Sequence, residues 1–371
     1  MLDFSSSLYL GLRHGSPSLR GWSSLSSGRP AALVEPDGAG EVAQDLATLI
    51  GCERGTLLPS TLHAFWDLFA MLADEGATIH VDAGAYPIAC WGIERAAARG
   101  ARVVRFAHHD LEALRRHVGR EARGGARPIV VTDGFCPGCG RPAPLRDYLD
   151  VVRPLGGLLV VDDTQALGIL GRRAGAAAPY GQGGGGTLRF TGAGGEATVV
   201  VSSLAKGFGA PVAVLAAGDG FVGRFEDRSE TRSHCSPPSV AAVRAAEHAL
   251  LVNLTRGDAL RDHLAELVLR FRRGLAEIGL RAFGRLFPVQ TLAPAPGCDA
   301  ARLHARLLGA GVRAVLHRDR AGHATRLSVL VTAQHTCGDI DQALAAIGGA
   351  AGRRSRQPSA TTISQSRGDR P

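Results

Sequence analysis

The chain contains a single lysine, Lys206, although lysine and arginine together number 42 among its 371 residues. Lysine can lose its proton and act as an amine nucleophile, whereas the guanidinium group of arginine stays protonated. Lys206 follows the apolar run 199–201 and precedes Gly207-Phe208-Gly209. A sole lysine after a buried strand is typical of a residue that binds a carbonyl group covalently. The alternative is a surface lysine retained by chance.

Two further groups that could do chemistry lie at the ends of predicted strands. The run 158–161 leads into Asp162, and the run 56–59 leads into Ser60 and Thr61 at the start of a predicted helix. The N–H groups and the dipole of a helix N-terminus favour an anion. An amine, a carboxylate and an anion site in one crevice match what pyridoxal phosphate requires, because they serve its aldehyde, ring nitrogen and phosphate. The sequence therefore predicts this cofactor.

The elements that must position these groups alternate between strand and helix. Short apolar runs without two-residue alternation predict buried strands at 56–59, 78–81, 102–106, 129–132, 158–162, 198–202 and 212–216. Apolar residues at three- and four-residue spacing predict helices at 40–50, 62–74, 88–99, 111–121 and 145–153. This order predicts an α/β fold with a doubly wound, mainly parallel sheet that binds ligands beyond the carboxyl ends of its strands.

The sequence predicts four segments. They are an N-terminal arm with little regular structure at 1–38, a large domain at 39–235, a smaller domain at 236–350 and a disordered tail at 351–371. In the smaller domain we expect helices at 239–254, 260–278 and 302–310 and a strand at 326–331. The glycine-rich segments 183–186 and 192–195 predict a flexible surface loop, because they lack the spaced glycines of a phosphate cradle.

Composition and charge exclude several classes of protein. The formal net charge is +8, but the arginines are scattered among acids and form no basic run with aromatics, so we expect no nucleic-acid partner. No apolar run approaches the roughly 20 residues of a membrane span, and the first residues lack the pattern of a secretion signal. We therefore expect a cytoplasmic protein without a membrane partner.

The seven cysteines predict neither a disulfide framework nor a metal site. Their number is odd and they are scattered through a long chain. Cys136-Pro137-Gly138-Cys139 has the spacing of a redox or zinc site, but no second CxxC completes four thiolates. This segment therefore predicts a turn.

Several motifs occur in the order found in one enzyme family. The stretch 131–145 resembles "TEGVFSMDG…PL", 161–171 resembles "VDDAHGxGVxG", 203–209 the lysine motif, 236–238 a "PP" turn, and 324–341 "ARLR…AAHT…DID". From Tyr9 to about Ile347 the sequence resembles the α-oxoamine synthases, pyridoxal-phosphate enzymes of fold type I. The resemblance implies a large sheet domain, a smaller C-terminal α+β domain and a homodimer with its active site at the subunit interface.

The resemblance also implies roles for individual residues. Lys206 would bind the cofactor and later move the substrate's α-proton, and Asp162 would pair with the pyridine nitrogen. Arg326 would bind the substrate carboxylate through a bidentate pair. The cofactor phosphate would be held by Ser60, Thr61, Leu62 and Ser203, with His234 reaching the phosphate of the neighbouring subunit.

Two residues depart from the family pattern. Tyr86 replaces the histidine that stacks on the cofactor, and Gln165 replaces the histidine that bonds its phenolic oxygen. A tyrosine ring can stack, but with a pKa near about 10 it is a poor proton shuttle at neutral pH. An amide can donate the hydrogen bond without changing charge. The segment His108-His109-Asp110 resembles the family's "HND" helix cap, so we expect no metal there.

The resemblance implies a transferase that condenses an amino acid with acyl-CoA or another acyl thioester, such as one on an acyl carrier protein, with loss of CO2. The alternative is an aminotransferase or other α-carbanion chemistry, which the exchanges at Tyr86 and Gln165 favour. A third reading is a non-catalytic partner subunit. Lys206 and Asp162 argue against it, because such a subunit has no chemical reason to keep the one lysine.

Overall fold

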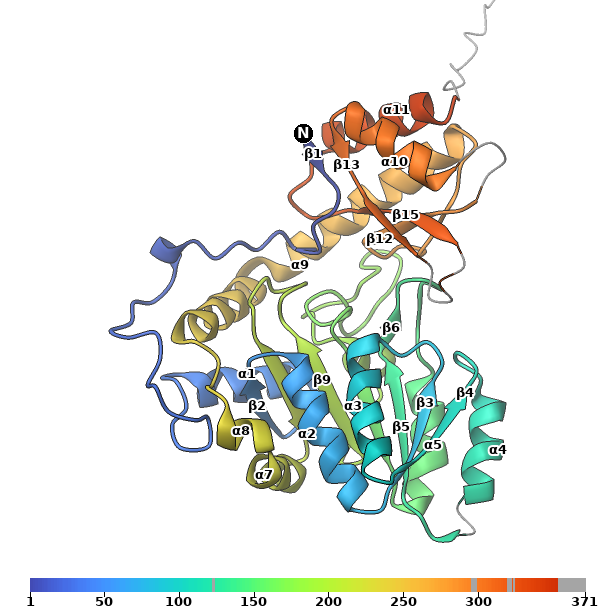
Figure 1. Ribbon diagram of the computed structural model, residues 1–371. Coiled ribbons are helices and arrows are strands. Elements are labelled where there is room, and N and C mark those ends of the chain that lie inside the picture. Colours follow the sequence, from blue (N-terminus) through green and yellow to red (C-terminus); the bar gives the residue numbers. More distant parts are fainter. Residues whose placement is uncertain (122–123, 295–298, 319–321, 323, 353–371) are drawn as a thin grey trace, which may run out of the picture.

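The computed structural model describes residues 1–121, 124–294, 299–318, 322 and 324–352. A large sheet with helices on both faces fills one end of the molecule, and a smaller sheet with its own helices fills the other (Figure 1). Helix α9 (Val240–Glu277) runs along both parts.

Seven strands form the central sheet in the order β2-β10-β9-β8-β5-β3-β4. Their bounds are β2 Arg54–Leu58, β3 Thr78–Asp82, β4 Arg102–Phe106, β5 Pro128–Asp133, β8 Leu158–Asp162, β9 Thr198–Ser203 and β10 Ala213–Ala217. All run in one direction except β10, which is antiparallel to both β2 and β9. Every predicted strand of this sheet is present, with its ends shifted by at most two residues, and the predicted fold class is confirmed.

Eight helices among the described residues pack around this sheet and cover both of its faces. They are α1 Ala39–Ile50, α2 Thr61–Asp74, α3 Pro87–Ala98, α4 Leu111–Glu121, α5 Leu145–Val152, α6 Thr187–Thr191, α7 Asp219–Arg228 and α8 Glu230–His234. Side chains of each strand alternate between two apolar cores. Val160 packs in the core that holds Phe65 of α2, and the next residue, Val161, packs in the core that holds Leu46 of α1. Because both faces of the sheet are buried, successive residues of a strand are all apolar, and the sequence shows continuous apolar runs.

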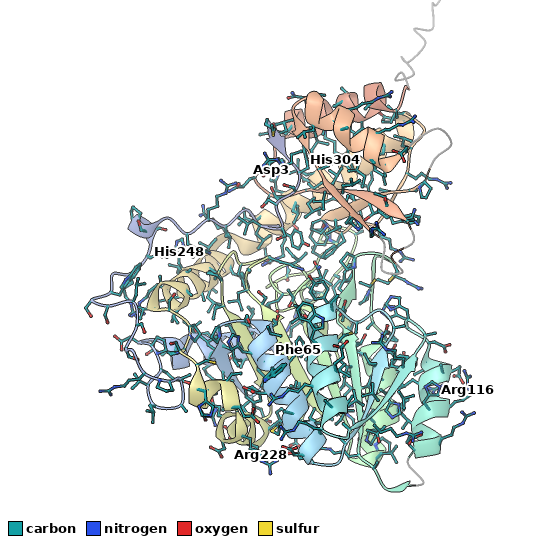
Figure 2. The ribbon with its side chains drawn as sticks, viewed as in Figure 1. Asp3, Phe65, Arg116, Arg228, His248 and His304 are labelled. Carbon is teal, nitrogen blue, oxygen red and sulfur yellow. The ribbon has the colours of Figure 1, made fainter. Side chains whose placement is uncertain are left out.

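The smaller part contains an antiparallel sheet in the order β11-β12-β15-β14. Its elements are β11 Ala282–Phe283, β12 Val289–Leu292, β14 Val315–Arg318, β15 Thr325–Leu330, α10 Ala300–Gly309 and α11 Cys337–Ala350. The N-terminal strand β1 (Leu2–Asp3) pairs in parallel with β13 (Val312–Arg313). Figure 2 accordingly shows Asp3 at the same end of the molecule as His304 of α10.

The predicted break between helices 239–254 and 260–278 is wrong, because α9 is one continuous helix of 38 residues. Gly257 lies in the expected gap, and its missing side chain leaves room for the guanidinium group of Arg261. That buried group donates to Asn253, to Asp258 and to the carbonyl oxygen of Gly168. Contacts with the large domain therefore stabilise the helix across a weak helix former.

The predicted surface loop at 183–186 is also wrong, because Gly184, Gly185 and Gly186 are buried. A Cβ at Gly186 would lie 1.9 Å from a carboxylate oxygen of Asp163, and one at Gly185 would lie 2.3 Å from a backbone oxygen of α1. The glycines allow the close packing of this segment against the end of β8. Its distant contacts leave no trace in a local sequence pattern.

Two further expectations bear on the chain as a whole. No helix among the described residues is long and apolar enough to cross a membrane. The predicted tail at 351–371 lies outside the described residues apart from Ala351 and Gly352.

Candidate active site

A cavity of about 860 Å³ lies where the carboxyl ends of β5 and β8 face the smaller sheet. The residues that line it from the large domain include Tyr86, Asp133, Asp162, Gln165 and Lys206. Those that line it from the smaller domain include Phe283, Val289, Thr291, His317, Arg326 and Ser328. The ends of parallel strands are where such folds bind ligands. A smaller cavity of about 420 Å³ shares Arg326 but contains no other predicted site residue.

Lys206 lies in the turn that follows β9, and its side chain points toward Tyr86. Its Nζ atom is 5.6 Å from the centroid of the Tyr86 ring. Burial lowers the pKa of Lys206, while the carboxylates of Asp162 and Asp133 oppose the shift. The reactive neutral amine is therefore more abundant near neutral pH than it is for an exposed lysine.

Asp162 is the last residue of β8 and is buried. Its Oδ1 accepts the Thr164 N–H at 3.1 Å, and Thr164 Oγ1 accepts the Ser203 N–H at 3.0 Å. These bonds fix the carboxylate relative to the end of β9. Burial raises the pKa of Asp162, while hydrogen bonds from Thr164 and the charge of Lys206 oppose the shift. A cation placed against this carboxylate would stabilise its ionised form.

Gln165 is held by a residue of the N-terminal arm. The Tyr9 hydroxyl donates to Gln165 Oε1 at 2.7 Å, and burial raises the pKa of Tyr9, so this hydroxyl keeps its proton. The amide NH2 group of Gln165 is then the end that can donate into the cavity. Tyr9 was not among the predicted site residues, because it lies 156 residues from Gln165 in the sequence.

Asp133 also lines the cavity and positions Tyr86. It is the last residue of β5, and its Oδ1 accepts the Tyr86 N–H at 2.8 Å. The prediction missed Asp133 as a site residue, although it ends a buried strand as Asp162 does. The same rule about strand ends could have found it.

The opposite wall comes from neighbouring strands of the smaller sheet. Arg326 of β15 pairs in register with His317 of β14. The Ser328 hydroxyl lies 2.8 Å from His317 Nε2 and 2.7 Å from Thr291 Oγ1. This polar network holds β15 against β12 and β14, and Arg326 of β15 lines the same cavity as Lys206. Residues 326 and 328 lie on the same face of their strand, because side chains alternate along it. This two-residue spacing could have predicted that Ser328 lines the site together with Arg326.

Five predicted residues do not line the cavity: Ser60, Thr61, Leu62, Ser203 and His234. Ser60 is the N-cap residue of α2, and its Oγ lies 2.9 Å from His63 Nδ1. His234 is exposed at the end of α8. The roles of all five at a phosphate group stay predictions.

The lining residues fit pyridoxal phosphate. Burial shifts the pKa values of Lys206 and Asp162 toward their neutral forms. A covalent bond to an aldehyde would use the neutral amine, and a protonated ring nitrogen would stabilise the carboxylate. Gln165 supplies a donor and Tyr86 an aromatic face. The set therefore matches the amine, carboxylate, donor and stacking group that this cofactor uses.

The chain belongs to the class I and II aminotransferase family, whose model matches residues 1–347. Its curated relatives include several 8-amino-7-oxononanoate synthases. It is 30% identical to the enzyme of Sodalis glossinidius over 360 residues, covering 93% of this chain and 87% of the relative. It is 33% identical to that of Geobacter metallireducens over 249 residues, covering 66% of this chain and 61% of the relative.

Solved structures agree on the fold. Serine palmitoyltransferase from S. paucimobilis, with bound PLP, has a TM-score of 0.81 at 20% identity, covering 94% of this chain and 88% of that one. The 8-amino-7-oxononanoate synthase of Francisella tularensis has a TM-score of 0.68 at 18% identity, covering 94% and 97%. The predicted resemblance to α-oxoamine synthases, fold type I and the pyridoxal 5'-phosphate cofactor are thereby confirmed. The protein is a pyridoxal-phosphate-dependent transferase.

Proposed function

We propose that this enzyme condenses an amino acid with an acyl thioester and releases CO2 and free thiol. One observation carries the proposal: the cavity contains Lys206 and Asp162 on one side and Arg326 on the other. The amine of Lys206, the carboxylate of Asp162 and the guanidinium group of Arg326 therefore line one cavity of about 860 Å³. The guanidinium group can bind the carboxylate of a substrate. The curated relatives support the reaction class.

Lys206 has the chemistry needed to move a proton at the substrate's α-carbon. When bound, pyridoxal phosphate supplies an electron sink for the pair of electrons left on that carbon. Asp162 would keep a proton on the cofactor's ring nitrogen, because its buried carboxylate lines the cavity and would be stabilised by that cation. Because burial lowers the pKa of Lys206, its amine can accept the α-proton near neutral pH.

Arg326 would orient the substrate through its carboxylate. A guanidinium group binds a carboxylate through two parallel hydrogen bonds and so fixes its direction. Tyr86 would cover one face of the cofactor ring, and Gln165 would donate to an anionic oxygen at the ring edge. Ser60, Thr61, Leu62 and Ser203 would bind the phosphate at the start of α2, where the helix dipole favours an anion.

The second candidate function is transamination or other α-carbanion chemistry. It is favoured by the lining itself, since Tyr86 and Gln165 stand where the family has two histidines that can change charge near neutral pH. A non-catalytic partner subunit is the least favoured reading, because Lys206 is retained and its pKa is lowered.

The proposed partners are an amino acid and an acyl thioester on coenzyme A or a carrier protein. We further propose a homodimer in which His234 reaches the phosphate of the neighbouring subunit, because His234 is exposed outside the cavity of its own chain. A cytoplasmic location and the absence of a nucleic-acid or membrane partner stay predictions from the sequence.

The visible absorption spectrum of the purified enzyme tests the proposal. Wild type and Lys206→Ala are each titrated with a panel of amino acids, with and without acyl-CoA. We expect the wild type to show a cofactor absorption band that the variant lacks. One amino acid of the panel should shift this band. Thiol should be released only when the amino acid and acyl-CoA are both present. A spectrum that converts to the amine form of the cofactor with an amino acid alone would instead establish transamination.

A further inference from the structure

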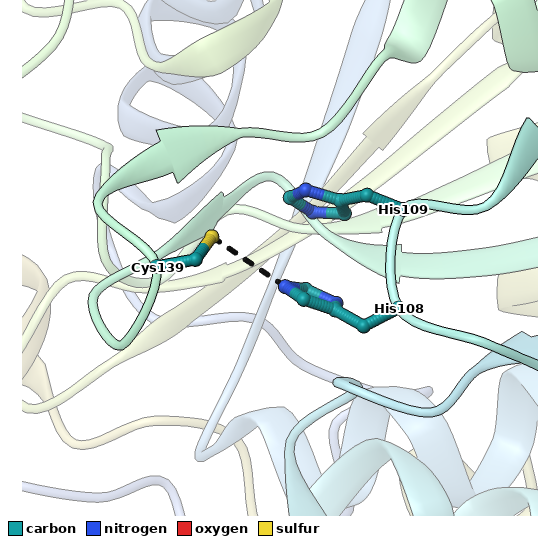
Figure 3. A group of neighbouring side chains, drawn as sticks. All are labelled: His108, His109 and Cys139. Carbon is teal, nitrogen blue, oxygen red and sulfur yellow. Dashed lines mark hydrogen bonds between the residues drawn. The ribbon is translucent and has the colours of Figure 1, made fainter.

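Three potential metal ligands meet beside the active-site cavity, and a fourth side chain lies outside their cluster in the same hairpin. His108 and His109 lie in the turn between β4 and α4, and Cys136 and Cys139 lie in the hairpin of β6 (Phe135–Cys136) and β7 (Arg141–Pro142). One ligand atom from each of His108, His109 and Cys139 lies within 4.8 Å of the others (Figure 3). Cys139 Sγ also lies 3.8 Å from the carbonyl oxygen of Cys136, which belongs to the same hairpin.

The spacing of these atoms suits a zinc ion. A tetrahedral zinc ion bound at about 2.3 Å to sulfur and about 2.0 Å to nitrogen separates those two ligand atoms by roughly 3.6 Å. The distance from Cys139 Sγ to His108 Nε2 is 3.5 Å. Both cysteines carry free thiols. The two side chains therefore already stand about where an ion between them would hold them.

The two histidines are oriented for this purpose by Asp82. The carboxylate of Asp82, which is buried at the end of β3, lies 2.7 Å from His108 Nδ1 and accepts the His109 N–H at 3.0 Å. The first contact leaves His108 Nε2 as the nitrogen that faces Cys139. A carboxylate behind a histidine is the usual second partner of a metal-binding imidazole.

His109 gives an independent indication of a missing ligand. Its Nε2 atom is buried and has no hydrogen-bond partner among the described residues. Its backbone is left-handed, with a φ of 59°, and its ring lies against that of His108 with centroids 3.8 Å apart and planes tilted by 32°. A hydrogen bond between His108 and Cys139 accounts for those two side chains, but not for the buried nitrogen of His109.

We infer that His108, His109 and Cys139 bind a structural zinc ion, and that the Cys136 side chain turns toward the ion to complete the site as its fourth ligand. Two thiolates and two imidazoles are a ligand set that selects zinc over magnesium or calcium, and four protein ligands close the coordination sphere. The ion would fasten the β6–β7 hairpin to the turn before α4. Because His108, Cys136 and Cys139 line the cavity, it would fix one wall of the active site without taking part in the reaction.

This inference revises the expectations from the sequence, which predicted a turn at 136–139 and a helix cap at 108–110. Each pair alone is too small for a zinc site. Only the packing of β3, β4 and the hairpin brings the two pairs together.

The test is the zinc content of the full-length enzyme. Reduced protein is loaded with zinc, desalted and measured by mass spectrometry of the metal, for wild type, Cys139→Ser and His109→Asn. The control is Cys52→Ser, which removes another half-buried thiol. We expect about one zinc per chain in wild type and control, and loss of most of it in the other two variants.

Replacement of zinc by cobalt gives a second readout. Cobalt bound by thiolates in tetrahedral geometry shows a charge-transfer band in the near ultraviolet and intense visible bands, which both ligand variants should lose. Circular dichroism confirms that each variant is folded.

Wild-type enzyme that keeps no more zinc than Cys139→Ser would overturn the inference. So would a Cys136–Cys139 disulfide that reforms in air in the presence of zinc. Neither result depends on acyl transfer, so this test and that of the proposed reaction can fail separately.

Discussion

Replacement of Gly186 by alanine should destabilise the enzyme far more than the same change at Gly183. Both glycines have left-handed backbones, with φ of +84° and +82°. The Cβ of an alanine at position 186 would lie 1.9 Å from Asp163 Oδ2, whereas one at position 183 would meet nothing within 4 Å. The two variants therefore differ in the clash with Asp163 and in the strain from the ψ angle of Gly186.

The size of the difference follows from the two environments. A left-handed backbone costs alanine about 1–2 kcal/mol at either position. Gly186 also has a ψ of −167°, in a region almost restricted to glycine, where other residues cost about 1–3 kcal/mol. Overpacking against Asp163 adds about 1–3 kcal/mol. We expect Gly186→Ala to lose about 2–6 kcal/mol more stability than Gly183→Ala, the sum of these two contributions.

Denaturant unfolding of both variants, saturated with pyridoxal phosphate, measures this difference. Asp163 follows Asp162 and accepts hydrogen bonds from the Thr187 N–H and hydroxyl, so Gly186→Ala should also weaken cofactor binding. Equal losses of stability in the two variants would refute the reasoning, since they would mean that the packing around Asp163 can relax.

Three other predictions concern the active site. Arg326→Lys should raise the KM for the amino acid about tenfold or more, because lysine cannot form the bidentate pair with the substrate carboxylate. Steady-state kinetics measure this KM, and an unchanged value would contradict the prediction. Tyr9→Phe should weaken cofactor binding severalfold, or about 1 kcal/mol, by releasing the Gln165 amide. Tyr180→Phe is its control, because the buried Tyr180 hydroxyl has no partner among the described residues. Because burial lowers the pKa of Lys206, the rate at which apoenzyme takes up pyridoxal phosphate should rise with pH and level off below pH 10.5, the ordinary lysine value. A rate that still climbs above that pH would show an unshifted lysine.

Local sequence patterns were sufficient for the sheet and for the groups at its edge. Buried strands leave apolar runs, and the rule that parallel strands end at one edge brings Lys206 and Asp162 together without any knowledge of distances. The same rule applied to β5 would have added Asp133. Arg326 was placed only by its resemblance to a family motif, because no local pattern shows which strand of one domain faces another.

Contacts between distant segments could not be predicted. Tyr9 reaches Gln165 from the N-terminal arm, and the buried Arg261 keeps α9 continuous past Gly257. The glycine-rich segment is buried because Asp163 and α1 pack against it, although its composition alone is typical of a loop. In each case the partner that decides the conformation lies far away in the sequence.

The most direct test of the proposed reaction is the ratio of CO2 to thiol released. The enzyme is supplied with an amino acid labelled with carbon-13 in its carboxyl group and with an acyl thioester, and both products are followed in one reaction. Condensation with decarboxylation predicts equal amounts of labelled CO2 and free thiol, and neither from Lys206→Ala. An oxo acid that keeps the labelled carboxyl group, formed without thiol, would contradict the proposal and establish transamination.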